Sequence, residues 1–323
     1  MIFAFLRVEC LRGEIHFGCG YPGLCHSSRF VYAGRVAALY RECAVVDAAL
    51  GKLLKGTIFA GRVYRFASID STNSALLQDA ALKDTSGSGL PEGTVYIADE
   101  QTAGRGRGGH TWHSAPGVGL YLSALLCPHL PPEDVLGITL AAGIAAADAI
   151  AQVAGIECDV RWPNDLLVQG KKTGGILTEM NSSNGGAVVV GFGINVNHTT
   201  MPPELRETAT SLLLAKAASA DGAPSKLSRM DATAFAVALL QFFDREYRQL
   251  AQDGLPALLA RFEQHSSYAR GKHVVVGEEG GYEGMTDGLD ERGFLRVKTA
   301  NGMRIVLSGT VRAKQVQGRR SDS

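Results

Sequence analysis

The stretch Glu133 to Val153 restricts the fold of this chain more than any other, because it is predicted to form a long alanine-rich helix that is apolar around most of its circumference. Such a helix needs other elements to cover it, and short segments with the composition of strands precede and follow it. They are Tyr64 to Ile69, Thr94 to Asp99, Gly119 to Leu126, Asp159 to Trp162, Leu166 to Val168, Thr173 to Glu179 and Gly186 to Val196. Strands joined by hairpins around one buried helix predict an α/β (α+β) fold with a mixed, largely antiparallel sheet rather than a doubly wound one.

Further helices and a second group of strands are predicted outside this region. Val45 to Leu54 has the spacing of an amphipathic helix, and Ser71-Thr72-Asn73 supplies N-cap residues for the helix that follows it. Asp231 to Gln252 forms a helix capped by Asp231, and Leu255 to His265 continues as a second helix. From Gly271 the chain changes to short strands punctuated by glycines, which is the pattern of a small β-barrel.

Composition limits the classes of function. The longest uncharged, largely apolar run, Val135 to Ala147, is too short to cross a bilayer, so no membrane-spanning segment is expected. The 32 lysines and arginines equal the 32 aspartates and glutamates, which gives no bulk electrostatic reason to expect nucleic-acid binding. The six cysteines include no C-x-x-C pair, and the opening MIFAFLRVEC is a poor secretory signal. A cytoplasmic location is therefore expected.

A loop suited to binding an anion joins two of the predicted strands. Ala98 to Trp112 reads ADEQTAGRGRGGHTW, in which four glycines bring backbone N–H groups close to a ligand and Arg105 and Arg107 offer charged donors. The residues also satisfy G-x-G-x-x-G, but a dinucleotide-binding motif has to open a helix, whereas this one runs into Trp112 and a Pro116-Gly117 turn. A simple connector is the alternative for such a loop taken alone.

Five motifs occur together in a fixed order. They are SIDSTN at 68 to 73, GRGRGG at 104 to 109, RWPND at 161 to 165, GKKTGGIL at 170 to 177 and GFGINVN at 191 to 197. In order and spacing they resemble the catalytic domain of biotin protein ligases, and the resemblance covers roughly residues 57 to 316. It implies the fold of biotin/lipoate ligases and class II synthetases, with a catalytic domain at 45–268 and an SH3-like domain at 269–318.

The resemblance also implies an activity. Members of this family use ATP and Mg2+ to convert biotin to biotinyl-5′-AMP and then transfer biotin to a lysine of a biotin carboxyl carrier protein or carboxylase carrier domain. Residues 1–44 show no helix-turn-helix pattern, so the monofunctional type without a DNA-binding domain is expected, and the role of this extension is open. The alternatives are a lipoate ligase or related acyltransferase and a biotin-responsive DNA-binding regulator. Whether the chain forms a homodimer is open.

Site residues follow from matching the motifs position by position. Lys172 and Arg107 are the expected catalytic residues. The expected biotin contacts are Ser71, Thr72, Asn73, Gln101, Gly104, Arg105, Gly106, Tyr121, Lys172 and Gly175. The expected nucleotide contacts are Arg107, Trp112, Asn164 and Asn195, and Asp165 is the expected metal ligand. Gly108 and His110 stand where some family members carry further arginines, so the number of cations that meet the phosphates is open.

Each of these residues also has a structural interpretation. Ser71 or Thr72 can serve only as a helix cap, and Tyr121 can be an ordinary core residue of its strand. Asn164 and Asp165 are common turn residues. Lys172 is expected to follow a tight Gly170-Lys171 turn, where a lysine is otherwise mostly solvated; that interpretation suits Lys171 better.

Overall fold

The computed structural model describes residues 10–11, 14–15, 45–82, 89–128, 135–181, 186–219, 228–277 and 280–314. The chain divides into two compact units, Met1–Arg35 and Val36–Ser323. In the first unit the described residues form two antiparallel strands, β1 (Cys10–Leu11) and β2 (Glu14–Ile15). The remainder of the 1–44 extension lies outside the described residues, as do Glu133 and residues 182–185. All other described elements belong to the second unit.

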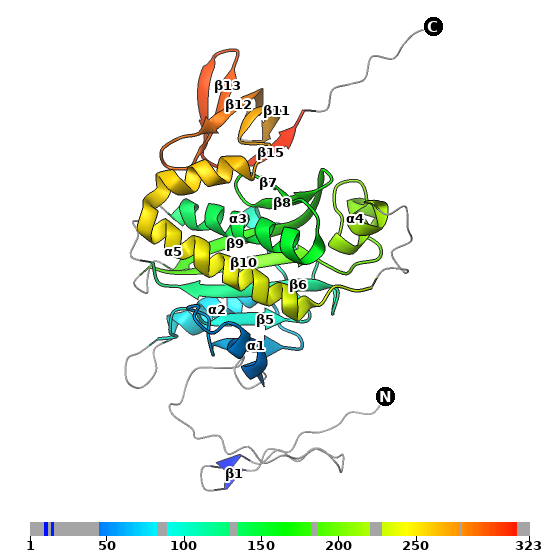
Figure 1. Ribbon diagram of the computed structural model, residues 1–323, viewed down its shortest axis with the longest axis vertical. Helices are drawn as coiled ribbons and strands as arrows, with labels where there is room; N and C mark the ends of the chain where they lie inside the picture. The colour runs from blue at the N-terminus through cyan, green and yellow to red at the C-terminus, as the bar shows by residue number, and fades with distance from the viewer. Residues whose placement is uncertain are drawn as a thin grey trace. The chain divides into compact units, whose positions relative to one another are not determined.

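An eight-stranded sheet with the order β3-β4-β5-β6-β10-β9-β8-β7 forms the body of the second unit (Figure 1). Its strands are β3 (Val45–Val46), β4 (Val63–Phe66), β5 (Val95–Ala98), β6 (Gly119–Leu126), β7 (Asp159–Arg161), β8 (Asp165–Val168), β9 (Lys171–Asn181) and β10 (Ala187–Asn195). Only β4 and β5 pair in parallel among these strands. The predicted mixed, largely antiparallel sheet is therefore confirmed.

The two faces of the sheet carry different helices. Val95 and Ile97 of β5 belong to the core cluster that includes α3 (Val135–Ala154) and α5 (Ala232–Gln264), while Tyr96 and Ala98 pack with α2 (Thr72–Ala81). This alternation follows from the two-residue period of a strand. Figure 1 shows α3 and α5 lying side by side across one face.

The α3 helix is longer than the uncharged run suggested. It has 20 residues and is apolar enough to cross a membrane by length and composition, so the argument from a short run is wrong. However, 72% of its most apolar window is buried inside the protein. Packing between the sheet and α5 therefore accounts for its apolar circumference, as predicted for a core helix.

The N-terminal end of the catalytic region differs from the prediction of one helix over Val45 to Leu54. Val45 and Val46 form β3, which pairs with β4, and α1 (Ala48–Leu53) starts after Asp47. Asp47 is the N-cap, and its side chain accepts a hydrogen bond from the backbone N–H of Leu50 at 2.9 Å. Two β-branched residues favour a strand, and the cap sets the true start of the helix.

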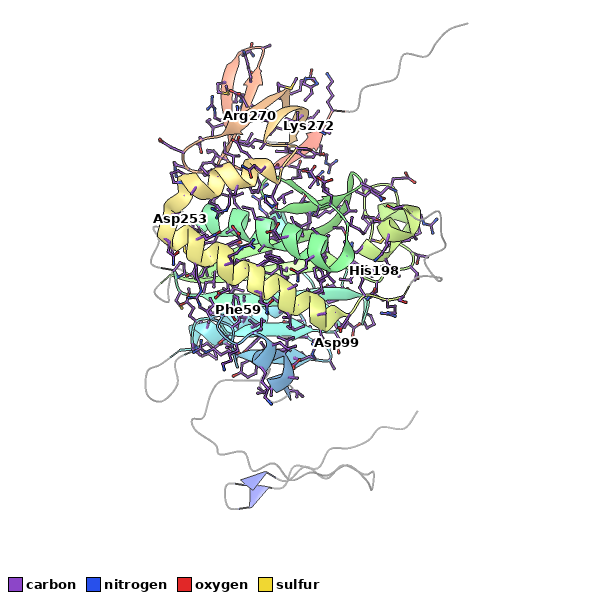
Figure 2. The ribbon with its side chains drawn as sticks, viewed as in Figure 1. Phe59, Asp99, His198, Asp253, Arg270 and Lys272 are labelled. Carbon is purple, nitrogen blue, oxygen red and sulfur yellow. The ribbon has the colours of Figure 1, made fainter. Side chains whose placement is uncertain are left out.

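Two predictions about helix ends are confirmed. The Asp231 carboxylate accepts hydrogen bonds from the backbone N–H groups of Thr233 (2.8 Å) and Ala234 (3.2 Å) at the start of α5. Gly254, with φ of 75°, then separates α5 into two helical segments, as expected from the break before Leu255. Figure 2 shows Asp253 at this bend. Two further elements, η5 (Pro203–Leu205) and α4 (Leu212–Ser219), follow β10.

The C-terminal strands form a five-stranded antiparallel sheet with the order β14-β13-β12-β11-β15. The strands are β11 (Arg270–Gly277), β12 (Tyr282–Leu289), β13 (Leu295–Thr299), β14 (Gly302–Val306) and β15 (Thr310–Ala313). Trp162 connects it to the catalytic region, because its indole Nε1 donates to the carbonyl of Gly293 at 2.9 Å. Figure 2 shows Arg270 and Lys272 at the start of this sheet. The short strands predicted from Gly271 are confirmed as a five-stranded antiparallel sheet.

Candidate active site

Three glycines of β9 and β10 lie together on the sheet face opposite α3 and α5, where they expose the backbone. Even-numbered residues of β10, such as Val190, belong to the core beneath those helices, so its odd-numbered residues face the other way. Gly175 of β9 and Gly191 and Gly193 of β10 form this surface, here called the glycine floor, and Gly175 pairs directly with Gly193. A Cβ at 191 would lie 2.1 Å from Asn73 Oδ1, and a Cβ at 193 would lie 2.6 Å from Trp112 Nε1. Glycine is required there because other groups approach the backbone closely.

The glycine–arginine loop is a narrow hairpin between β5 and β6. The Trp112 N–H donates to the Gly104 carbonyl at 2.8 Å, and the Gly106 N–H donates to the His110 carbonyl at 2.7 Å. A Cβ at Gly104 would lie 2.5 Å from the Trp112 carbonyl oxygen, so no larger residue fits without movement of the backbone. At Gly108 it is the backbone conformation that favours glycine, because φ is 62° and residues with a Cβ rarely adopt a positive φ.

Buried polar side chains from α2, the loop and β6 form one hydrogen-bond network. Thr72 donates to Gln101 Oε1 through its backbone N–H (2.9 Å) and its hydroxyl (3.0 Å). Ser123 Oγ lies 2.7 Å from Thr72 Oγ1 and 2.5 Å from Asn73 Oδ1. Ser71 is the N-cap of α2, as its structural interpretation predicted, and it is also buried next to these groups. These four side chains, Ser71, Thr72, Gln101 and Ser123, are uncharged and suit an uncharged polar ligand group, and Asn73 joins them to the Glu179 carboxylate.

Two arginines of the loop bond to residues on the other side of the glycine floor, one in β9 and one in the turn between β7 and β8. Arg105 Nη2 donates to Glu179 Oε2 of β9 at 2.6 Å, and Arg107 Nη1 donates to Asn164 Oδ1 at 3.1 Å. A cavity of about 290 Å³ lies between them, lined by Arg105, Gly106, Arg107, Gly108, Gly109, His110, Leu177 and Glu179. Burial lowers the pKa of Arg107 from its ordinary value, and the Asp165 carboxylate opposes this shift. The guanidinium remains a cation, because its ordinary pKa is far above neutral.

Lys172 lies at the edge of the glycine floor. Its Nζ is 2.5 Å from Asp165 Oδ1 and 5.6 Å from the centre of the Trp112 ring. A Cβ at Gly175 would lie 3.5 Å from the same Nζ, so glycine leaves room for the ammonium group. Lys171 instead donates to the Arg206 carbonyl at 2.8 Å. The two lysines therefore have different surroundings, as the sequence indicated.

The turn before Lys172 is one residue earlier than predicted. Gln169 (φ of 51°) and Gly170 (φ of 76°) form it, which is the pattern of a type I′ hairpin turn, and Lys171 is the first residue of β9. Thr173 is an extra residue in β9, because Leu166 pairs with Gly174 while Leu167 pairs with Lys172. This bulge turns Lys172 to the same face as Gly175.

The expected metal ligand, Asp165, is engaged by two cations. Its Oδ1 contacts Lys172, and its Oδ2 accepts from Arg161 Nη2 at 2.5 Å. Burial would raise the pKa of Asp165, but Lys172 and Arg161 together hold it below its ordinary value. Within the described part of the chain, no three His, Cys, Asp or Glu side chains gather as a metal site. These residues do not fit a preformed magnesium site, and the metal role of Asp165 stays a prediction.

Asn195 and Tyr121 hold the backbone around the site. Asn195 Nδ2 donates to the Thr210 carbonyl at 3.1 Å and so fixes the segment after β10 beside β9. Tyr121 is fully buried, and its hydroxyl donates to the Ala115 carbonyl at 3.0 Å. Burial raises the pKa of Tyr121 well above its ordinary value. This position favours the core interpretation of Tyr121, and its contact with biotin stays a prediction.

Several residues of the site were missed from the sequence. Ser123 and Glu179 each contact two predicted site residues, but a serine and a glutamate within strands give no distinct signal. Gly191 and Gly193 stand in a quoted motif, although no role was expected for them. His198 is buried with no hydrogen-bond partner for either ring nitrogen in the described structure, and burial followed by the influence of His113 lowers its pKa.

Comparisons with known proteins agree with this geometry. Residues 65–197 match the Biotin/lipoate A/B protein ligase family, and residues 271–312 match the Biotin protein ligase C terminal domain. The bifunctional ligase/repressor BirA of Bacillus subtilis is 36% identical over 228 residues, which cover 68% of this chain and 66% of that protein. The Escherichia coli BirA is 31% identical over 251 residues, 76% of this chain and 71% of that protein.

A solved structure supports the same assignment. The biotin protein ligase from Aquifex aeolicus, in complex with biotin and ATP, has a TM-score of 0.65 and 27% identity, and the match covers 78% of this chain and 99% of that one. The two family matches lie on the eight-stranded sheet and on the C-terminal sheet, respectively. This chain therefore belongs to the biotin protein ligase family.

Proposed function

We propose that this chain is an ATP-dependent biotin–[acetyl-CoA-carboxylase] ligase, which activates biotin as biotinyl-5′-AMP and transfers it to a lysine of a biotin carboxyl carrier domain. The observation that supports this most is the cluster of Arg105, Arg107 and Lys172 beside the neutral network around Thr72. Biotin has a neutral ureido ring at one end and a carboxylate at the other. A site with a neutral polar end and a cationic end suits both groups.

In the first step a carboxylate oxygen of biotin attacks the α-phosphorus of ATP, and pyrophosphate leaves. Two anions repel each other, so cations fixed near the phosphate lower the energy of the transition state. Arg107 and Lys172 are the residues we assign to this role. Asp165 and Trp112 hold the Lys172 ammonium group in place, and a cation fixed by the protein reduces the reorganisation that the reaction requires.

In the second step the lysine amine of the carrier domain attacks the carbonyl carbon of biotinyl-5′-AMP, AMP leaves, and the amine loses a proton. We assign no described side chain as the base for that proton. Magnesium is proposed to enter with ATP, bound mainly through phosphate oxygens and water.

Pyrophosphate release on addition of biotin and ATP, followed by label transfer to a purified carboxylase carrier domain, tests this proposal. Lipoate in place of biotin tests the alternative of a lipoate ligase. The match of residues 271–312 to a biotin protein ligase domain favours biotin. Equal pyrophosphate release with lipoate would contradict the assignment of substrate.

We also propose that the chain is of the monofunctional type and is cytoplasmic. Its zero net charge supports the first proposal, because DNA binding depends on neutralising phosphates. The relatives named above are ligase/repressors, so a salt-dependent DNA-binding assay with the full chain is the necessary test. The second proposal rests on the co-substrate ATP, which is abundant in the cytoplasm, and cell fractionation tests it.

A further inference from the structure

Glu179 is an acid beside the glycine–arginine loop, and it is separate from Asp165, the carboxylate that pairs with Lys172. It stands on β9, and its Oε2 accepts hydrogen bonds from Arg105 Nη2 at 2.6 Å and from Asn73 Nδ2 at 3.0 Å. These donors come from the glycine–arginine loop and from α2. A negative charge beside an anion site opposes the binding of anions. The presence of Glu179 there therefore needs an explanation, and the orientation of its two donors supplies one.

At the buried end, Glu179 fixes the orientation of the Asn73 amide. Asn73 Nδ2 also donates to the Leu177 carbonyl at 3.0 Å, so both of its hydrogens point to groups that only accept. The amide oxygen Oδ1 must then face Ser123. A reversed amide would place its oxygen against the carboxylate and the carbonyl, which is unfavourable. Glu179 therefore sets the direction of donors and acceptors around Asn73.

At the exposed end, Glu179 fixes Arg105 without occupying all of its donors. A guanidinium has five N–H donors, and the contact uses Nη2 alone. Within the described residues, no hydrogen bond from Nε or Nη1 of Arg105 is formed. The Arg105 side chain is 42% exposed, so without this contact it would sample many rotamers. The remaining donors are available to a carboxylate ligand.

We propose that Glu179 is a positioning residue for biotin, holding Arg105 and Asn73 in the arrangement that binds it. The inference rests on the proposed function, in which these two residues contact biotin. A carboxylate that orders a cation in advance lowers the entropy lost when the ligand binds. The opposite outcome, in which Glu179 occupies the place of the biotin carboxylate and competes with it, would make its removal tighten binding.

The test compares Glu179→Gln with the unmodified full chain. Biotin affinity is measured by calorimetry without ATP, and KM values for biotin and ATP are measured by pyrophosphate release. We expect the Kd and KM for biotin to rise about tenfold, because a charge-assisted hydrogen bond becomes a neutral one, with the KM for ATP within about twofold of its original value. Glu179→Ala is expected to weaken binding further, because glutamine can still accept from Asn73.

Glu283→Gln is the matched control. Glu283 pairs with Lys314 on the C-terminal sheet, so the variant removes the same charge and a similar ion pair away from the site. Its biotin affinity should be unchanged. Arg105→Gln breaks the Arg105–Glu179 ion pair from its exposed side, where a substitution does not endanger folding. The biotin Kd of the double variant with Glu179→Gln should rise by less than the product of the two single increases, because both changes break the same pair.

The outcomes separate this inference from the proposed function. Unchanged or tighter biotin binding by Glu179→Gln overturns the positioning role, and so does an equal rise in the KM values for biotin and ATP. Failure of the unmodified chain to bind biotin or release pyrophosphate overturns the proposed function itself.

Discussion

Replacing Gly193 by alanine tests the glycine floor with the smallest possible change. The new Cβ would lie 2.6 Å from Trp112 Nε1 and 2.7 Å from Trp112 Cε2. Non-bonded atoms of these types are in contact at about 3.5 Å, so the indole has to retreat by about 1 Å. Trp112 belongs to the loop that carries Arg105 and Arg107, and its ring also faces Lys172 Nζ. Movement of the indole should therefore also displace Arg105, Arg107 and Lys172.

We expect a large effect on activity and a small one on stability. A misplacement of about 1 Å in a catalytic arrangement can reduce the rate by about 100-fold, whereas overpacking typically costs about 1–3 kcal/mol of stability. Pyrophosphate release measures the first effect, and thermal unfolding measures the second. Tryptophan fluorescence reports the movement directly, since the chain has two tryptophans and the other, Trp162, is buried and hydrogen-bonded to Gly293.

Gly89→Ala is the control for glycine replacement as such. Its Cβ would be 3.7 Å from the nearest heavy atom, an ordinary contact, and the residue lies outside the site. This variant should retain full activity. If Gly193→Ala releases pyrophosphate at the original rate with unchanged fluorescence, Trp112 does not pack on the glycine floor and the geometry of the site is wrong.

Three further predictions concern charges. Lys172→Ala should lower adenylate formation by roughly two orders of magnitude, since loss of such an electrostatic donor costs about 3 kcal/mol. The fold should persist, because Arg161 still pairs with Asp165. Near-normal pyrophosphate release would contradict the role of Lys172. Arg107→Ala removes one of the two cations assigned to the first step and the bond to Asn164 that holds the loop, so the mutant should make adenylate more slowly, release early what it makes and label bystander lysines. Tight retention of adenylate would refute the role in holding the loop. Hydrogen bonding to Asp148 raises the pKa of His265 above its ordinary 6.5, so the stability that this pair contributes is complete below pH 6.5 and is lost as the pH rises through the pKa of folded His265. The free energy of unfolding of His265→Gln, measured with denaturant, should therefore be lower than that of the unmodified chain at pH 6, and the two values should converge at high pH.

Sequence patterns predicted the elements well where one local signal decides them. The period of the strands, the Asp231 cap and the glycine before Leu255 each have a direct physical effect on the backbone nearby. Val45 and Val46 were misassigned because a strand at the edge of a sheet depends on its neighbour, β4, which is not adjacent in the sequence. Glu179 was missed for the same reason, since its two partners lie 74 and 106 residues away along the chain.

Lys172 shows how far a strand period alone can mislead. Gly174 and Ile176 of β9 face the core beneath α3, because a Cβ at Gly174 would meet Leu166 and Ile194, and Ile176 is buried in that core. Counting back by two places Lys172 on the same face, where an unpaired ammonium group would be strongly unfavourable. The extra residue Thr173 reverses this, and the side chain reaches the ligand face instead. No propensity in KKTGG indicates a bulge, so the position of Lys172 followed only from the resemblance of the whole motif. The bulge is thus the local feature that allows one short hairpin to supply both a core face and the cation that we assign to the first step of the reaction.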